Sequence, residues 1–273
     1  MVKVSKAVSG FRSVGYSLKV AKEVGFQKFL QSANSKNTCK TCAYGMGGQN
    51  GGMRNEAGNY PEVCKKSLQA QITDLQPAIP EEILTSSLSD LRQRPPRELE
   101  RLGRLNTPLL KTRDHNHFQI VSWDEALSRI SERFKSQPAH RTFFYSSGRS
   151  SNEAAFLLQI FARVFGTNNV NNCSYYCHQA SGVGLAKTIG SGTATVVLED
   201  VKHADMIWVL GANPSSNHPR FMTELLHCRR RNGQVIVINP LREPGLVKFK
   251  VPSDWRSMVL GDCEIASTYI QPN

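Results

Sequence analysis

Two short apolar runs, Met206–Leu210 and Gln234–Ile238, are the feature that most constrains how this chain folds. The stretch between them, Arg220–Arg231, has a helical pattern and is followed by Asn232-Gly233, a common helix stop. A strand, a helix and a second strand within about 35 residues form a βαβ unit, whose two strands run parallel. We therefore predict an α/β fold with a doubly wound parallel sheet.

Both apolar runs lead into an Asn-Pro pair, at Asn213-Pro214 and at Asn239-Pro240. Parallel α/β sheets bind ligands at the carboxyl ends of their strands, where short polar side chains can hydrogen-bond a sugar or a purine. Asn-Pro also simply starts turns, so the pairs alone do not establish a binding site. No Gly-x-Gly-x-x-Gly fingerprint follows a strand, so an ordinary NAD site is not expected.

Two capping boxes predict where helices begin in the middle of the chain. Ser122 with Glu125, and Ser150 with Glu153, each place a hydroxyl and a carboxylate three residues apart. Apolar residues then recur at helical spacing in both segments. Near the N-terminus, Gly15–Leu30 has the pattern of one short amphipathic helix.

The formal charge of +12 predicts an anionic partner, either nucleic acid or a phosphate-rich cofactor. No zinc-finger, RRM or KH signature accompanies the charge, so nucleic acid is not the partner we expect. No run approaches the roughly 20 apolar residues that a membrane span needs. Residues 1–37 are basic but contain no signal-peptide core or twin arginine, so we predict a cytoplasmic protein.

The seven cysteines indicate metal or redox chemistry in a reducing compartment, because an odd number in a long chain argues against a secreted disulfide scaffold. Cys39 and Cys42 form a Cys-x-x-Cys pair in a Gly-rich loop, and Cys64 follows. These cysteines have three interpretations. They could bind a structural zinc ion together with His115 or His117, or they could hold an iron–sulfur cluster. Cys39 and Cys42 could also form a thioredoxin-like redox pair, although such a pair normally lies at the start of a helix. Spacing alone does not choose between zinc and iron–sulfur.

A second candidate site is Cys177 beside His178, just before a run of small residues that we expect to start a helix. A thiol in such a position can be activated as a thiolate. A buried structural cysteine is the alternative. Cys173 stands four residues earlier, so a second metal site is a further interpretation.

Several of these motifs together resemble a known family. Cys-x-x-Cys, a later Cys-x-Lys and Ser-Trp-Asp-Glu-Ala-Leu, in this order, resemble the N-terminus of molybdopterin oxidoreductases. Further motifs resemble the formate dehydrogenase alpha subunits within that family, and they are Ser147-Gly148-Arg149, Asn152-Glu153, Phe165–Val170, Cys177-His178 with Val183-Gly184-Leu185, and Gly211–Pro214 with Asn217-His218-Pro219. The match runs in order from about residue 38 to residue 252.

The resemblance implies that Cys39, Cys42 and Cys64 hold a [4Fe–4S] cluster. It also implies that Lys66 lies between this cluster and a pterin and aids electron transfer. The family's usual third cysteine is replaced here by Met46, and a thioether is a weak ligand. We expect a cluster whose remaining ligand the sequence does not identify.

The same resemblance implies a molybdenum bis(molybdopterin guanine dinucleotide) cofactor. Cys177 falls on the family's molybdenum ligand, and His178 would take up the proton released from the substrate. The positions that fall where the family binds the dinucleotide are Gly211, Asn213, Asn217, His218 and Asn239. A soft thiolate suits a transition metal, and a basic chain suits anionic phosphates.

Taken together, the resemblance predicts a formate-dehydrogenase-like oxidoreductase. It would pass electrons from a small-molecule substrate to the cluster and then to an unidentified acceptor protein. Formate is the candidate substrate. We expect a basic helical segment at 1–37, an iron–sulfur-like subdomain with a connector at 38–110, and an α/β domain at 111–273. Family members are usually more than twice as long, so we expect this to be the N-terminal part. The alternatives are an inactive truncated remnant and a zinc-binding nucleic-acid module.

Overall fold

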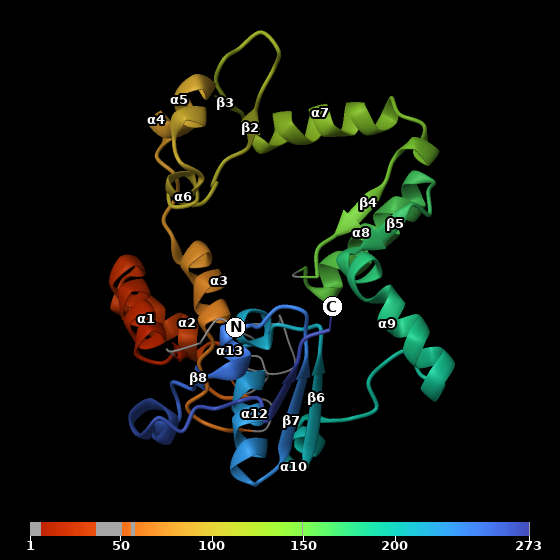
Figure 1. Ribbon diagram of the computed structural model, residues 1–273. Coiled ribbons are helices and arrows are strands. Elements are labelled where there is room, and N and C mark those ends of the chain that lie inside the picture. Colours follow the sequence, from red (N-terminus) through yellow and green to blue (C-terminus); the bar gives the residue numbers. More distant parts are fainter. Residues whose placement is uncertain (1–6, 37–50, 56–57, 149, 273) are drawn as a thin grey trace. The chain divides into compact units, whose positions relative to one another are not determined.

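The computed structural model describes residues 7–36, 51–55, 58–148 and 150–272, with residues 70–73 described in their backbone alone. The chain divides into two compact units, Met1–Leu75 together with Ala194–Asn273, and Gln76–Thr193 (Figure 1). This is a division by packing, and the predicted boundaries after residues 37 and 110 stay a prediction. Among the described residues, no helix is both long enough and apolar enough to cross a bilayer.

The first unit is built from both ends of the chain. Its elements are β1 (Val8–Ser9), α1 (Phe11–Val24), α2 (Phe26–Asn34), α3 (Lys65–Leu75), α10 (Leu198–His203), β6 (Met206–Leu210), α11 (Pro214–Asn217), α12 (Phe221–Arg230), β7 (Gln234–Ile238), α13 (Pro244–Val247), β8 (Phe249–Lys250), the π-helical turn η2 (Arg256–Leu260) and β9 (Thr268–Ile270). Strands β6, β7 and β9 form a parallel sheet in that order, and β1 pairs with β8 in parallel. The predicted βαβ unit and the α/β class are therefore confirmed.

The core of this unit lies between α12 and the sheet (Figure 1). Met222, Leu225 and Leu226 on α12 are fully buried, and they pack with Val235 and Val237 of β7. Burying side chains of this size contributes on the order of 1.5 to 3 kcal/mol each, so this cluster holds the strand ends in place. The strands therefore provide a rigid base for the loops at their carboxyl ends.

The N-terminal segment forms two helices where the sequence predicted one. Helix α1 ends at Val24, and α2 begins at Phe26. Gly25 between them has a φ of 92°, which a helix does not allow and which glycine adopts without strain. The prediction of a continuous helix over Gly15–Leu30 is therefore wrong, because this glycine breaks it.

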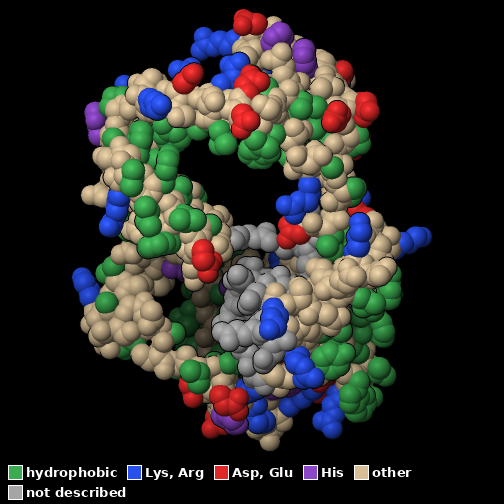
Figure 2. All heavy atoms as spheres, turned by 180° about the vertical axis from the view of Figure 1, so that it is seen from behind, with side chains coloured by type: hydrophobic (Ala, Val, Ile, Leu, Met, Phe, Trp, Pro, Cys, Tyr) green, Lys and Arg blue, Asp and Glu red, His purple; other side chains and the backbone are tan. Residues whose placement is uncertain are grey.

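The second unit consists mainly of helices. Its elements are α4 (Glu81–Leu84), α5 (Leu88–Gln93), α6 (Pro96–Leu99), β2 (Leu109–Leu110), β3 (Gln119–Ile120), α7 (Trp123–Lys135), η1 (Ala139–Arg141), β4 (Phe144–Ser146), α8 (Asn152–Phe165), β5 (Val170–Asn172) and α9 (Cys173–Ile189). Strands β2 and β3 are antiparallel, whereas β4 and β5 are parallel. Hydrophobic side chains gather along α7 on the side away from its charged ones (Figure 2).

One of the two predicted helix caps is confirmed, and the other is displaced by one residue. The Ser122 hydroxyl accepts a hydrogen bond from the Glu125 amide at 3.1 Å, as predicted for the start of α7, whereas the Glu125 carboxylate forms an ion pair with Arg129. At α8 the capping residue is Ser151, whose hydroxyl accepts from the Ala154 amide at 3.2 Å. Ser150 was the wrong choice because α8 begins at Asn152, so the residue directly before the helix is Ser151.

An aromatic cluster joins α7, β4 and α8 in the second unit. The ring of Phe134 stacks on Phe144 with centroids 5.9 Å apart. Phe161 and Phe165 contact both rings edge-on. Aromatic pairs of this geometry add about 0.5 to 1.5 kcal/mol beyond their buried area, so the cluster orients these three elements.

Candidate functional site

The predicted cofactor-binding residues of the first unit lie at the carboxyl edge of the β6–β7–β9 sheet. After β6, the chain turns at Gly211, whose φ is 60°, and its amide donates to the Ile238 carbonyl. Asn213 then caps α11. Its Oδ1 accepts from the Ser215 hydroxyl at 2.6 Å and from the Ser216 amide at 3.3 Å. The Asn213 carboxamide oxygen thus shapes the loop that it belongs to.

Asn239, at the end of β7, joins this loop to the next one. Its side chain is nearly buried, its Nδ2 donates to the Ala212 carbonyl at 3.4 Å, and its Oδ1 accepts from the Leu241 amide at 3.0 Å. Both hydrogen bonds are made within the protein. The predicted contact of Asn213 and Asn239 with a dinucleotide stays a prediction.

The two loops also touch through a glycine. A Cβ on Gly245 would lie 2.3 Å from both the Cβ and the Oγ of Ser215, a distance that no real contact allows. Gly245 therefore permits α13 to approach the loop after β6. The close approach and the Asn239 bond hold the two strand-end loops together as one surface.

Two of the predicted binding residues have side chains available at this edge. Asn217 and His218 are exposed, and their side chains have no hydrogen-bond partner among the described residues. The backbone amides of both close the α11 turn onto Asn213 and Pro214. The carboxamide and the imidazole are thus displayed by a fixed backbone.

A cavity of about 750 Å³ lies within the first unit and brings predicted residues together. Cys64 and Lys66, from the start of α3, line it together with Ser215 and Ser216 of the loop after β6. A cavity of this size accommodates a cofactor-sized ligand. The predicted cluster cysteine and lysine therefore share one cavity wall with the loop predicted to bind the dinucleotide.

The charge of this cavity is positive. Its basic lining residues are Arg12, Lys65, Lys66 and Arg220, and the described lining residues include no carboxylate. The Lys65 ammonium lies over the ring of Tyr16 at 5.1 Å from its centroid. The buried Arg220 guanidinium forms an ion pair with Glu62. Such a lining favours an anionic ligand with an apolar body.

The predicted iron–sulfur ligands are described only in part. Cys39, Cys42 and Met46 lie outside the described residues. Cys64 is 8% exposed, and Lys66 in the first turn of α3 is exposed. Within the described residues, no three His, Cys, Asp or Glu side chains form a group that could hold a metal ion. The cluster itself therefore stays a prediction.

The predicted molybdenum ligand belongs to the second unit. Cys177 is exposed on α9, which begins at Cys173 and is capped by Asn172. The expectation that a helix starts after Cys177 is therefore wrong, because the small residues that follow continue a helix already begun. His178 is exposed next to it, and neighbouring helical residues do not face each other. The role of Cys177 as the molybdenum ligand stays a prediction.

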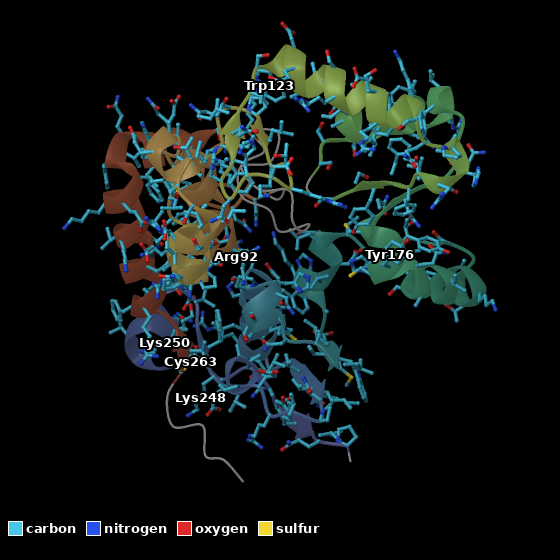
Figure 3. All side chains as sticks on the ribbon, turned by 90° about the horizontal axis from the view of Figure 1, so that it is seen from above. Arg92, Trp123, Tyr176, Lys248, Lys250 and Cys263 are labelled. Atoms are coloured by element: carbon cyan, nitrogen blue, oxygen red, sulfur yellow. The ribbon has the colours of Figure 1, made fainter. Side chains whose placement is uncertain are left out.

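The other described cysteines differ from Cys177. The Cys173 thiol accepts a hydrogen bond from the Gly148 amide at 2.9 Å. Cys228 and Cys263 are buried in the first unit, and burial raises the pKa of both thiols. Cys263 lies near Lys248 and Lys250, whose charges oppose that rise (Figure 3). These two thiols have the surroundings of ordinary core residues.

The family model for molybdopterin oxidoreductases matches residues 104–258, more than half of the 273 residues. The chain belongs to the molybdopterin oxidoreductase family. This confirms the family resemblance drawn from the motifs.

Several relatives are similar over part of their length. An uncharacterized oxidoreductase of Mycobacterium tuberculosis is 39% identical over 68% of this chain and 24% of its own length. The protein YdeP of Escherichia coli is 42% identical over 63% and 23%, respectively. The alpha subunit of F420-dependent formate dehydrogenase 1 of Methanococcus maripaludis is 36% identical over 54% and 22%. The matches thus span about a quarter of these relatives.

One solved structure, acetylene hydratase from Pelobacter acetylenicus, is also similar. It shares 19% identity, and the match covers 51% of this chain and 20% of that one with a TM-score of 0.42. This likeness is too low to add to the family assignment.

Sequence reasoning did not point to Arg242 and Tyr269, which lie at the same strand edge as the predicted residues. The Arg242 guanidinium lies over the ring of Tyr269, 5.4 Å from its centroid. Burial raises the pKa of the Tyr269 phenol. The sequence did contain a signal for Arg242, because this residue follows Asn239 at the end of β7 by three positions. Its contact with Tyr269 on β9 could not be predicted without knowing that β9 lies beside β7.

Proposed function

We propose that this chain carries part of a molybdopterin-dependent, formate-dehydrogenase-like oxidoreductase that passes electrons from a substrate at molybdenum to a [4Fe–4S] cluster. The proposal includes a bis(molybdopterin guanine dinucleotide) form of the cofactor, formate as the substrate and a separate protein as the electron acceptor. A reducing compartment such as the cytoplasm would keep the thiols in the form that binds metal.

The observation that carries the proposal is the shared cavity of the first unit. Cys64 and Lys66 line it together with Ser215 and Ser216. A redox chain needs its electron donor and acceptor close together, and this cavity wall places the proposed cluster ligand Cys64 with two serines of the loop that is proposed to bind the dinucleotide. The cationic lining fits the negative phosphates of a pterin dinucleotide.

The chain's own residues would bind and orient the cofactors. Cys64 would donate a thiolate to the cluster, and the Lys66 ammonium would place positive charge beside it. The exposed Asn217 carboxamide and His218 imidazole can hydrogen-bond the polar edges of a dinucleotide. The loops that carry them are held by Asn239 and Gly245, so little conformational freedom is lost on binding.

Cys177 and His178 would serve the substrate end of the reaction. A soft thiolate suits molybdenum, and the exposed Cys177 thiol is open to it. A bound molybdenum–pterin group would supply the two-electron chemistry. Oxidation of formate to carbon dioxide releases two electrons and one proton, and a ring nitrogen of His178 would accept that proton.

Metal analysis tests the proposal. The chain is purified without oxygen from cells that make the molybdenum cofactor, alongside Cys64→Ala, Cys177→Ala and the control Cys263→Ala. Cys263 matches Cys64 because both are buried cysteines of the first unit. We expect iron to be lost from Cys64→Ala and molybdenum from Cys177→Ala, with both retained in the control. A parent chain that binds neither iron nor molybdenum would contradict the proposal.

A further inference from the structure

Four large apolar side chains protrude from one flank of the first unit, which α1 and η2 form (Figure 1). They are Phe11 at the start of α1, Trp255 directly before η2, and Val259 and Leu260 of η2, and their exposed fractions are 68%, 65%, 72% and 66%. We call these four residues the apolar patch. Figure 2 shows hydrophobic side chains gathered along this flank. Single exposed apolar residues are ordinary on a protein surface, whereas a group of them marks an interaction surface.

Contacts between the two elements bring the members of the apolar patch together. The amide of Gly10, which directly precedes Phe11, donates to the Lys250 carbonyl at 3.1 Å. A Cβ built on Gly10 would lie 3.5 Å from the Met258 sulfur, and Met258 directly precedes Val259. The start of α1 therefore packs against η2, and the apolar patch spans both elements.

The turn η2 is held in a fixed shape from within. Ser257 is fully buried, and its hydroxyl donates to the Val251 carbonyl at 3.1 Å and accepts from the Val251 amide at 2.9 Å. The Lys250 ammonium donates to the Met258 carbonyl at 2.8 Å. The chain leaves the turn at Gly261, whose φ is 78°. A fixed backbone therefore displays the apolar patch, since Ser257 and Met258 are the residues of the turn that face inward.

Basic side chains stand at the edge of the apolar patch. The Arg256 guanidinium lies over the Trp255 ring, 5.8 Å from its centroid. Lys19 and Lys22 are exposed on α1. Lys22 lies about three helical turns beyond Phe11, so the two side chains share one face of the helix. The flank thus has an apolar centre with cations around it.

The carboxylates on this flank do not cancel its positive charge. Asp254 and Asp262, which precede and follow η2, both bind Arg230 in the first unit. Helix α1 carries one carboxylate, Glu23, against three cations. The flank therefore has the same sign of charge as the whole chain, whose formal charge is +12.

These features together favour a lipid surface as the partner. An anionic bilayer surface attracts lysine and arginine, and aromatic side chains settle at the level of its headgroups. Protruding side chains insert readily into a fluid layer, whereas a protein partner would need pockets that match them. A second copy of this chain would bring two formal charges of +12 together, which opposes self-association.

We propose that the flank formed by α1 and η2 binds the surface of a membrane rich in anionic phospholipids. The apolar patch would insert among the headgroups, and Lys19, Lys22 and Arg256 would contact lipid phosphates. Such attachment involves one leaflet and leaves the chain lying on the bilayer. The inference is independent of the proposed function, because none of these residues is proposed to bind iron, molybdenum or substrate.

Vesicle sedimentation of the full chain tests the inference. Vesicles of phosphatidylcholine mixed with an equal part of phosphatidylglycerol are compared with vesicles of phosphatidylcholine alone. We expect the chain to sediment with the anionic vesicles and to stay in solution with the neutral ones, and high salt should weaken the binding. Trp255 fluorescence should shift to shorter wavelength on binding as the ring leaves water, measured with Trp123 and Trp208 replaced by phenylalanine.

Two double variants separate the apolar contribution from the electrostatic one. Val259→Ser with Leu260→Ser should weaken binding to anionic vesicles about tenfold, because apolar surface no longer leaves water. Lys19→Gln with Lys22→Gln should weaken it about twentyfold, because each lysine is attracted by the anionic surface. Leu241→Ser is the matched control, since Leu241 is 68% exposed in the first unit but lies outside the apolar patch. It should leave vesicle binding unchanged.

Circular dichroism and melting temperature show whether each variant keeps its fold, and the salt dependence of the parent chain tests the electrostatic contribution without a substitution. Three results would overturn the inference: no sedimentation with anionic vesicles, equal binding to both kinds of vesicle, or an equal loss in Leu241→Ser. Binding to soluble polyglutamate but not to vesicles would replace it with an acidic protein partner. A parent dimer that Val259→Ser with Leu260→Ser makes monomeric in sedimentation velocity, without vesicle binding, would replace it with a second copy of the chain.

Discussion

Replacing Asp254 by asparagine should destabilise the first unit through its ion pair with Arg230. Arg230 Nη1 lies 2.5 Å from Asp254 Oδ2, and its Nη2 donates to Oδ1 at 2.8 Å. Asp254 also accepts a hydrogen bond from the Ser257 amide at 2.7 Å. Both charged side chains are less than one fifth exposed, so water screens the pair only partly. The pair connects α12 to the turn that leads into η2.

The size of the effect follows from the pKa of Asp254. The Arg230 hydrogen bonds, against an opposing effect of burial, lower this pKa from its ordinary value of 3.8 to about 2. A depression of this size corresponds to about 2 kcal/mol of stability. Because the folded pKa is the lower one, the contribution is complete above pH 4. It is lost as the pH falls from about 4 to about 2.

The assay is urea denaturation followed by Trp255 fluorescence, with Trp123 and Trp208 replaced by phenylalanine so that the signal reports on η2. Asp254→Asn should lower the free energy of unfolding by about 2 kcal/mol at pH 7 and by progressively less towards pH 2. The control Asp262→Asn removes a half-exposed partner of Arg230 and should change stability by less than about 1 kcal/mol. A loss that is the same at pH 7 and pH 2, or a larger effect from Asp262→Asn, would refute this reasoning.

Three further predictions use other features of the structure. Gly245→Ala should destabilise the first unit by about 1 to 3 kcal/mol, because its Cβ would collide with Ser215, and adding Ser215→Gly should restore much of the loss in the same denaturation assay. Ser151→Ala should destabilise the second unit by about 1 kcal/mol in a denaturation assay followed by Trp123 fluorescence, whereas Ser150→Ala should have little effect. A larger loss of stability from Ser150→Ala than from Ser151→Ala would mean that Ser150 caps α8. Iodoacetamide at pH 8 should modify the exposed Cys177 before Cys228 and Cys263, whose burial raises their pKa, and peptide mass spectrometry would reveal any other order.

The sequence predicted the central sheet well because its signals are local. The apolar runs at β6 and β7 are bounded by turn residues, and the helix between them ends where Asn232, with a φ of 63°, and Gly233 interrupt it. The N-terminal break at Gly25 was missed, because glycine is tolerated within a helical pattern and hydrophobic periodicity does not show a turn of one residue.

The candidate site was predicted unevenly for a similar reason. Motif spacing pointed to Asn213 and Asn239, but it could not show that their side-chain oxygens cap neighbouring backbone amides. The cavity shared by Cys64 and Ser215 joins segments far apart in the chain, so no local pattern reveals it. The packing of Arg242 on Tyr269 likewise depends on β9 lying beside β7.

The pairing of β1 with β8 determines the order in which this chain can fold during synthesis. Val8 emerges from the ribosome well before its partner Phe249 is made. The second unit, Gln76–Thr193, is continuous and can complete its own contacts in the interval. The apolar side chains of the N-terminal segment therefore lack part of their packing surface until Phe249 has been made, and a chaperone would be needed most during that period.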